Sequence, residues 1–260
     1  MITLQSPPQL SQFTRPKKVL WIFPKLDSHQ QWTDQLSSKS LRNLAAHSHQ
    51  ILKKQQITYQ ALPLTEAIYA KWHVFYTDMM QQLDHDVIAS PTWFQERKDA
   101  LKKICLLEFR QNDILVGGSI ITCDFENTWN HNFKASMRNI LFSERNASLG
   151  TLMEFIYLEY VFANNAKQVT SGLSRNGFGY FNTLGYLASK LKMGYSPFAS
   201  PDNIHDQEYL IQSPKTLTAW FVFDQYNNRH ILLYPKISLF PSELLTYLQR
   251  QQIPLISYYL

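Results

Sequence analysis

The clearest pattern along the chain is an apolar stripe of helical spacing that follows Thr65. Its members, separated by four, three and four residues, are Ile68, Trp72, Phe75 and Met79. An α-helix turns once in about 3.6 residues, so side chains at these intervals lie on one face. The stripe therefore predicts an amphipathic helix that begins at Thr65 and buries this face against the rest of the protein.

Three apolar segments after this helix predict strands joined by short turns. They cover residues 104–110, 114–123 and 126–134, with the turn residues Gln111-Asn112-Asp113 and Asp124-Phe125 between them. Asn and Asp favour tight turns because their side chains hydrogen-bond to the nearby backbone. Consecutive strands joined in this way pair antiparallel, so the segments predict a meander.

Helix boundaries are indicated at three further places. Residues 92–95 and 151–154 have the Thr-x-x-Gln and Thr-x-x-Glu patterns of a capping box, which predict helices that begin at these threonines. We expect the first of these helices to end near Lys102. Gly194 follows an apolar segment that starts at residue 181, and a glycine in that position is expected to end a helix.

The remaining elements complete an alternation of strands and helices. We expect strands over residues 18–23, 57–62, 168–171, 216–224 and 229–234, a polar helical region over 28–56, and a last helix over 241–251. A meander that continues through a crossover helix requires a mixed sheet. The chain is therefore predicted to have an α/β fold, with a mixed central sheet and helices on both faces.

Changes along the chain predict three parts. Residues 1–56 form an N-terminal extension with a short strand and a polar helix, and residues 57–200 form the core. Residues 201–260 add a β-hairpin and a helix that complete the sheet.

Composition limits the class of protein. The 260 residues are 45% hydrophobic and 17% charged, which supplies one substantial core or two small ones and excludes a disordered or collagen-like chain. The net charge of +5 is compatible with an anionic ligand. The basic residues nevertheless form small groups rather than the long stripe that is typical of nucleic-acid binding.

Several other classes lack their sequence patterns here. No segment reaches the roughly 18 apolar residues of a membrane span, and the N-terminal residues lack the order of a signal peptide. Cys105 and Cys123 lie in apolar segments, where we expect buried thiols in a reducing cytoplasm. There is no Cys/His cluster of zinc spacing, no Gly-x-x-x-x-Gly-Lys-Ser/Thr loop and no Gly-x-Ser-x-Gly turn, so no bound metal is expected.

The order of elements resembles the GNAT acyltransferase fold, and three segments are similar to FemAB-related acyltransferases. Residues 40–44 with 57–59 resemble the entry segment of that group, and residues 114–121 resemble its third strand. Residues 189–197 resemble its closing aromatic–Lys–x–x–x–Gly–aromatic signature. The resemblance covers roughly residues 37–200.

This resemblance implies a cytoplasmic N-acyltransferase that moves an acyl group from a thioester donor to a small-molecule or peptide amine. Acyl-CoA is the expected co-substrate, with no permanently bound cofactor. Charged tRNA is the alternative donor, as in FemAB relatives. A third alternative is a non-catalytic member that only binds a ligand or a partner.

The sequence departs from the family pattern in two places. Many GNAT enzymes that use coenzyme A carry Arg/Gln-x-x-Gly-x-Gly/Ala before their third helix. Residues 145–150 have their glycine two positions late and lack the second one. Ser189 stands before Lys190, where FemAB-type enzymes often have an aromatic residue.

The resemblance places residues 143–151 at a helix N-terminus, beside a fourth strand that diverges from the fifth. Free amides at a helix N-terminus, helped by the helix dipole, attract phosphate. The candidate donor-binding residues are Arg145, Asn146, Ser148, Gly150 and Thr151. The alternative is an ordinary N-capping loop.

Three residues are candidates for catalysis. Lys190 lies one helical turn after Tyr186, on the same side of its helix, and can bind an anionic group or the developing oxyanion. His131, predicted to share a strand face with Trp129 and Phe133, can accept the amine proton. A solvent-exposed lysine and a hydrogen-bonded core histidine are the structural alternatives.

Other residues are weaker candidates. Asp124 and Glu126 can act as bases but fit a turn, and Tyr180 and Tyr195 join Tyr186 as phenols that can protonate a leaving group. Residues 171–179, rich in glycine, can shape an acceptor pocket or serve only as a connector.

Overall fold

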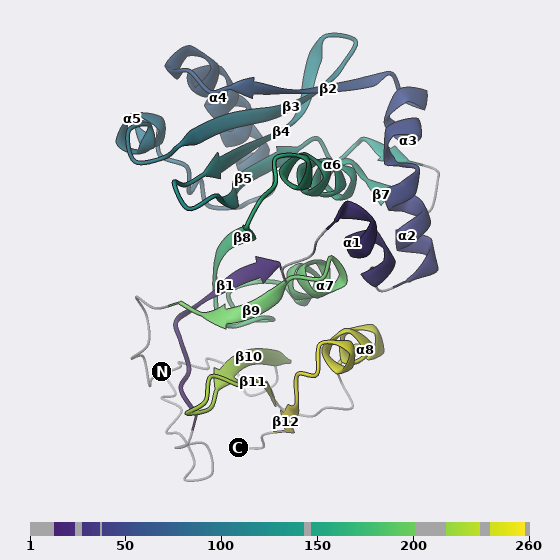
Figure 1. Ribbon diagram of the computed structural model, residues 1–260, viewed down its shortest axis with the longest axis vertical. Helices are drawn as coiled ribbons and strands as arrows, with labels where there is room; N and C mark the ends of the chain where they lie inside the picture. The colour runs from purple at the N-terminus through teal and green to yellow at the C-terminus, as the bar shows by residue number, and fades with distance from the viewer. Residues whose placement is uncertain are drawn as a thin grey trace. The chain divides into compact units, whose positions relative to one another are not determined.

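A computed structural model describes residues 13–23, 28–36, 38–142, 147–200, 217–234 and 240–257 (Figure 1). The chain divides into two compact units, one of which runs from Lys25 to Thr170. The other joins Met1–Pro24 to Ser171–Leu260. The boundaries at residues 56 and 200 follow changes in sequence and remain a prediction. No helix in the described ranges has the length and apolar character needed to cross a membrane.

The unit of residues 25–170 follows the predicted alternation of elements. Its elements are α1 (His29–Gln35), α2 (Lys39–Ala46), α3 (Ser48–Lys54), β2 (Ile57–Pro63), α4 (Glu66–Gln82), α5 (Trp93–Arg97), β3 (Lys103–Gln111), β4 (Ile114–Cys123), β5 (Thr128–Ser136), β6 (Leu141–Phe142), β7 (Ala147–Ser148), α6 (Leu149–Ala163) and the start of β8 (Gln168–Arg175). Strands β2 to β5 pair antiparallel with their neighbours in sequence order, which confirms the meander.

The other unit contains β1 (Lys18–Phe23), the end of β8, α7 (Leu184–Lys192), β9 (Ser196–Ala199), β10 (Thr218–Phe223), β11 (Arg229–Tyr234), α8 (Ser242–Arg250) and β12 (Leu255–Ser257). The main sheet has seven strands in the order β2-β3-β4-β5-β8-β1-β9, and β10, β11 and β12 form a second sheet. The hairpin of β10 and β11 is present as predicted, but the prediction that it completes the central sheet is wrong, because it pairs with β12 in the separate sheet. Strands β9 and β12 were not expected from the sequence.

Two adjacent glycines allow helices to approach β4 from opposite sides. A Cβ on Gly118 would lie 2.7 Å from Trp72 of α4, and one on Gly117 would lie 2.8 Å from the sulfur of Met153 of α6. Successive strand residues point to opposite faces of a sheet. Helices α4 and α6 therefore cover opposite faces of this strand, which we call the α4 face and the α6 face.

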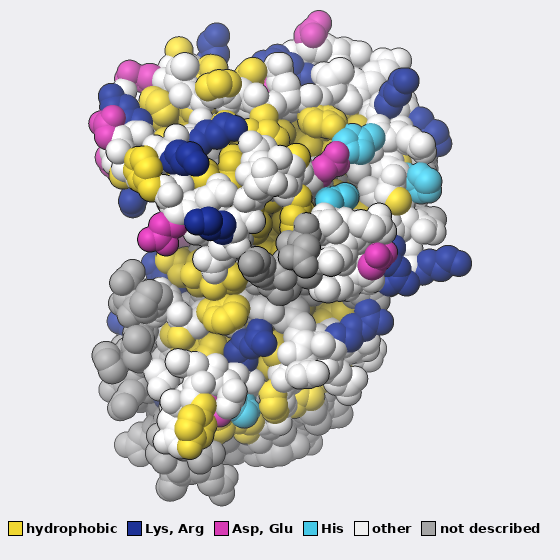
Figure 2. Space-filling view, in the orientation of Figure 1, with side chains coloured by type: hydrophobic (Ala, Val, Ile, Leu, Met, Phe, Trp, Pro, Cys, Tyr) yellow, Lys and Arg dark blue, Asp and Glu magenta, His cyan; other side chains and the backbone are white. Residues whose placement is uncertain are grey.

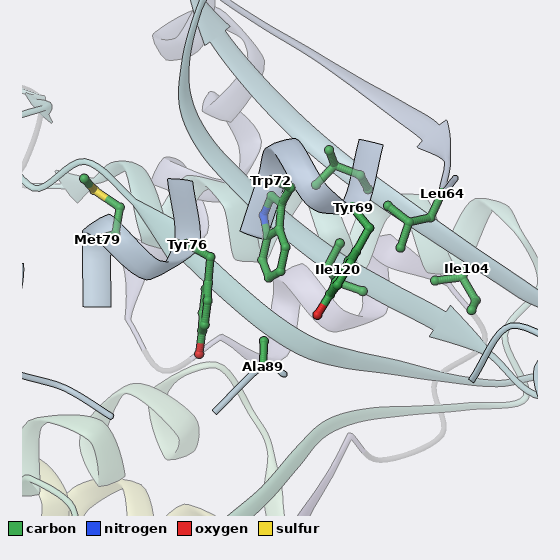
Figure 3. Packing of buried hydrophobic residues seen from close by; sticks show 10 residues of the cluster. Leu64, Tyr69, Trp72, Tyr76, Met79, Ala89, Ile104 and Ile120 are labelled. Atoms are coloured by element: carbon green, nitrogen blue, oxygen red, sulfur yellow. The ribbon is translucent and has the colours of Figure 1, made fainter. Parts of the chain in front are cut away.

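The α4 face holds an aromatic core (Figure 3). The buried residues of the helix are Tyr69, Trp72, Tyr76 and Met79, whereas the predicted stripe members Ile68 and Phe75 are only partly buried. The stripe is thus displaced around the helix toward its tyrosines. Burial of Tyr69 is possible because its hydroxyl donates to the Ser90 carbonyl oxygen at 2.5 Å.

Neither predicted capping box forms. Thr92 makes no capping hydrogen bond, and its hydroxyl donates instead to Glu96, in a helix that ends at Arg97 rather than near Lys102. Helix α6 begins before Thr151, because Ser148 accepts from the Thr151 amide and acts as the N-cap. An upstream serine thus competes successfully with the threonine.

Helix α7, in contrast, begins later than predicted. Thr183 caps it by accepting a hydrogen bond from the Tyr186 amide at 3.0 Å, so the helix starts at Leu184 and not at residue 181. It ends before Gly194, whose φ of +91° is the left-handed conformation that favours glycine. The predicted glycine stop is confirmed.

Candidate active site

A β-bulge in β5 brings two ionisable side chains to one face of the sheet. Adjacent residues of β4 pair with Phe133 and His131, so β5 carries one extra residue at Asn132. A bulge shifts the alternation of side chains by one position. His131 and Lys134 therefore both lie on the α6 face, while Phe133 packs on the α4 face. The prediction that His131 and Phe133 share a face is wrong for this reason.

Glu154 of α6 binds both of these side chains. Nδ1 of His131 lies 3.3 Å and Nζ of Lys134 lies 2.9 Å from its Oε2. Only 5% of the Glu154 side chain and 3% of the His131 side chain are exposed. Lys134 also donates to the Gly150 carbonyl oxygen at 3.2 Å. A carboxylate buried this deeply requires positive or hydrogen-bonded partners, and these two side chains supply them.

Tyr157 lies next to this cluster. Its ring centroid is 4.4 Å from that of His131, and its hydroxyl donates to the Thr170 carbonyl oxygen at 3.1 Å. Burial raises the pKa of the Tyr157 phenol well above its ordinary value. The phenol therefore stays neutral and keeps its hydrogen bond at physiological pH.

Strand β5 loses its second strand partner directly before His131. Its parallel pairing with β8 comprises three residue pairs, residues 128–130 with 168–170, and the Thr170 hydroxyl donates to Asn130 Oδ1 at 2.8 Å. Residues 131–136 pair with β4 on one edge and, within the described ranges, with no strand on the other. The register confirms the expected end of pairing between two neighbouring strands.

The N-terminus of α6 contains three of the predicted donor-binding residues. The Ser148 hydroxyl contacts the Thr151 hydroxyl at 3.1 Å and accepts from the Thr151 amide at 3.3 Å. The Ser148 hydroxyl thus caps the helix, and Gly150 lies between the two residues in sequence. Arg145 and Asn146 lie outside the described residues.

Lys190 lies in the other unit, between two tyrosine rings. Its Nζ is 5.3 Å from the ring centroid of Tyr186 and 5.2 Å from that of Tyr195. It also donates to the Ser171 hydroxyl and, at 3.3 Å, to the Ser171 carbonyl oxygen. The predicted approach of Lys190 to Tyr186 is confirmed, and cation–π contacts and hydrogen bonds hold the partly buried ammonium group.

Comparison with known proteins adds information on the fold. No protein-family model and no curated protein matches the sequence. FemX matches the structure with a TM-score of 0.52 and 11% identity, over 78% of this chain and 64% of FemX. The chain shares the fold of FemX. Its mixed seven-stranded sheet flanked by helices confirms the predicted GNAT-like α/β fold.

Two other solved structures are similar at lower scores. The C-terminal domain of a lysylphosphatidylglycerol synthetase from Agrobacterium fabrum gives a TM-score of 0.46 at 8% identity, over 73% of this chain and 63% of that one. A tandem GNAT protein from the clavulanic acid biosynthesis pathway gives a TM-score of 0.42 at 12% identity, over 75% of this chain and 59% of that one. The chain spans about three fifths of the length of the solved structures named here.

Within the FemX-like fold, several weaker candidates have structural roles. Asp124 Oδ1 accepts from the amides of Glu126 and Thr128 at 2.9 and 2.8 Å, so it shapes the turn before β5. In the glycine-rich segment of residues 171–179, the first five residues belong to β8. Asn176 is fully buried and donates to the Pro16 and Phe221 carbonyl oxygens. Tyr180 stacks edge-on against Phe181 at the surface.

Sequence reasoning missed Lys134, Glu154 and Tyr157, and it considered Ser171 only as part of the glycine-rich segment. The shared face of Lys134 and His131 depends on the bulge, which no local pattern in β5 indicates. The sequence pattern assigns Glu154 to a capping box, which is an exposed role, whereas its side chain lies on the buried side of α6. A glutamate in the most apolar segment of the chain is the one signal that could have identified it.

Proposed function

We propose that the protein is a transferase that moves an acyl group from a thioester donor, with acyl-CoA as the expected co-substrate, to an amine. The observation that carries the proposal is the end of β5–β8 pairing directly before the buried His131–Glu154 pair. A strand edge without a strand partner can bind the amides of an extended donor arm, as in other cases of strand addition. The α6 N-terminus, which follows β5 in the chain, supplies amides and a dipole for a phosphate.

His131 is the proposed general base. Acyl transfer requires a neutral amine, and an imidazole can accept its proton directly or through water. The Glu154 carboxylate, 3.3 Å from Nδ1, stabilises the imidazolium that forms. The Lys134 ammonium, 2.9 Å from the same oxygen, holds the carboxylate in its charged form. These three groups act within one unit of the chain.

A tRNA-dependent aminoacyl transferase is the second candidate, because the likeness to FemX and the net charge of +5 favour it. The two donors differ in size and charge, so direct binding distinguishes them. A non-catalytic protein that only binds a ligand is the third outcome.

Thermal denaturation in the presence of coenzyme A, acetyl-CoA or charged tRNA tests these alternatives. A ligand that binds only the native state adds about 2.7 kcal/mol at a hundred-fold excess over its Kd, which raises the Tm by several degrees. We expect acetyl-CoA to raise it. No shift at concentrations up to about 1 mM would exclude acyl-CoA. A shift with tRNA alone would favour the second candidate.

The Gly150→Ala variant localises the binding. A Cβ there would lie 3.4 Å from Ser136 Oγ and 3.9 Å from Ser148 Oγ, which are ordinary contacts, so the variant should fold normally. The added methyl group lies where a phosphate would approach the α6 amides. We expect the Kd for acetyl-CoA to rise about tenfold, which corresponds to about 1.4 kcal/mol. An unchanged Kd would place the phosphates elsewhere.

Lys190 is proposed to stabilise the oxyanion or to bind an anionic group of the substrate. Removal of one oxyanion donor reduces turnover by about a hundred-fold or more, so Lys190→Ala should lose most activity and keep its fold. Release of free thiol from acetyl-CoA with a panel of amines provides the measurement. Lys192→Ala, two residues further along α7, is the matched control and should retain activity. Normal turnover in Lys190→Ala would remove this residue from the site.

A further inference from the structure

A tyrosine, a histidine and a glutamate form a hydrogen-bonded chain apart from the candidate active site. The Tyr59 hydroxyl lies 2.8 Å from Nδ1 of His49, and Nε2 of His49 lies 2.6 Å from Oε2 of Glu159. The three residues come from β2, α3 and α6 of one unit. Histidine and acidic side chains lie together on the surface drawn in Figure 2.

The partners fix the direction of both hydrogen bonds. A carboxylate only accepts, so a neutral His49 carries its proton on Nε2 and donates it to Glu159. Nδ1 is then an acceptor, and the Tyr59 hydroxyl donates to it. This is the order of hydroxyl, imidazole and carboxylate in which a nucleophile is activated by a base and the base is oriented by an acid.

All three side chains are accessible to a reagent. Tyr59 is 38% exposed, and the side chains of His49 and Glu159 are 45% and 42% exposed. Tyr59 also lies on β2, an edge strand of the main sheet, and its ring stacks on that of Phe109 with centroids 5.7 Å apart. The stacking holds the Tyr59 ring, and therefore its hydroxyl, in place.

We propose that Tyr59 is a nucleophilic acylation site for activated acyl esters, with His49 as its general base and Glu159 as the positioning residue. The phenolic oxygen bonds to the carbonyl carbon of the ester, and the phenolic proton moves to Nδ1 of His49. The bond from that carbon to the leaving oxygen breaks, and the alcoholate leaves with the electron pair. The product is O-acyl-Tyr59, and the imidazolium releases its proton to water. This proposal does not depend on the proposed transferase function.

The pKa of the Tyr59 phenol distinguishes general-base catalysis from reaction through free phenolate. Burial and the Glu159 charge both raise the pKa of the Tyr59 phenol, so spontaneous ionisation is harder here than in solution. Reaction through free phenolate would therefore leave Tyr59 slower than an open tyrosine. General-base help from His49 predicts the opposite order of reactivity.

Tyr226 is the internal control. It is 76% exposed, and its hydroxyl has no hydrogen-bond partner among the residues that the structure describes. The full-length protein is treated with p-nitrophenyl acetate, and peptide mass spectrometry follows acetylation of Tyr59 and Tyr226 with time. Since general-base catalysis contributes about a hundred-fold or more, we expect Tyr59 to react at least about tenfold faster than Tyr226.

Variants separate catalysis from a structural role. His49→Gln retains hydrogen-bonding groups but has no base, and should reduce the Tyr59 rate to that of Tyr226 or below. Glu159→Gln should lower the Tyr59 rate, and Glu159→Asp should restore part of it. The Tyr226 rate should stay constant in every variant, which reports equal reagent activity, and an unchanged Tm reports an intact fold. Equal rates at Tyr59 and Tyr226 in the wild type, or a Tyr59 rate that His49→Gln leaves unchanged, would overturn the proposal.

Discussion

Glu154→Ala is expected to lower the free energy of unfolding by about 3 kcal/mol, because the variant removes a packed side chain and leaves Nδ1 of the buried His131 without its Glu154 partner. The carboxylate is 5% exposed and binds His131 and Lys134 through one oxygen. The Lys134 side chain is 35% exposed and keeps its hydrogen bond to the Gly150 carbonyl oxygen, so most of the loss comes from the buried His131 side. Urea denaturation of the variant and the wild type gives the difference.

Glu159→Ala is the matched control for this result. Glu159 lies on the same helix and also binds a histidine, but its side chain is 42% exposed. Exposed pairs contribute about 1 kcal/mol or less. Equal losses in the two variants would contradict a desolvated cluster around Glu154.

The second large effect is expected at Gly179. Its φ is +89°, and a Cβ there would lie 2.1 Å from the backbone oxygen of Leu217. No rotation of a side chain can relieve contact with a backbone atom. Gly179→Ala should therefore combine left-handed strain with overpacking and cost about 3 kcal/mol. Hydrogen exchange should locate the loss in the unit that contains α7 and β10.

Gly185→Ala should change the free energy of unfolding in the opposite direction and stabilise the protein. Gly185 is in the first turn of α7, where the nearest atom to an added Cβ is Thr183 Oγ1 at 3.7 Å. Alanine in a helix is favoured over glycine by up to about 1 kcal/mol, so this variant should be slightly more stable than the wild type. If Gly179→Ala and Gly185→Ala both destabilised the protein, any substitution near α7 would be unfavourable, and the contact with Leu217 would not explain the effect at Gly179.

The elements that repeat a strong period could be predicted from the sequence. The meander and the helix that follows it depend on local alternation and on turn residues, and both are present as expected. The first residue of a helix could not be predicted where several neighbouring polar residues can each act as the N-cap. Ser148 and Thr183 decided two of these helix starts against the predicted start. The short strand β9 pairs with residues 19–22 of β1, far away in the sequence, so no local pattern indicated it.

The candidate site was only partly accessible to sequence reasoning. His131 and Lys190 were identified as residue types suited to acyl transfer. Their partners Glu154 and Ser171 depend on register and on helix–sheet packing, which a linear pattern does not contain. The roles of these residues in turnover, and the identity of the donor, stay predictions for the experiments above.

The extra residue at Asn132 also gives a way to search for distant relatives. It makes a spacing of three residues, His-x-x-Lys, point two side chains the same way on a strand, where a regular strand needs an even spacing. A glutamate twenty positions after the lysine completes the pattern. A homologue without the bulge needs its lysine one position earlier or later to keep the contacts of the histidine, the lysine and the glutamate. The two spacings would therefore distinguish two groups of homologues even where overall identity is low.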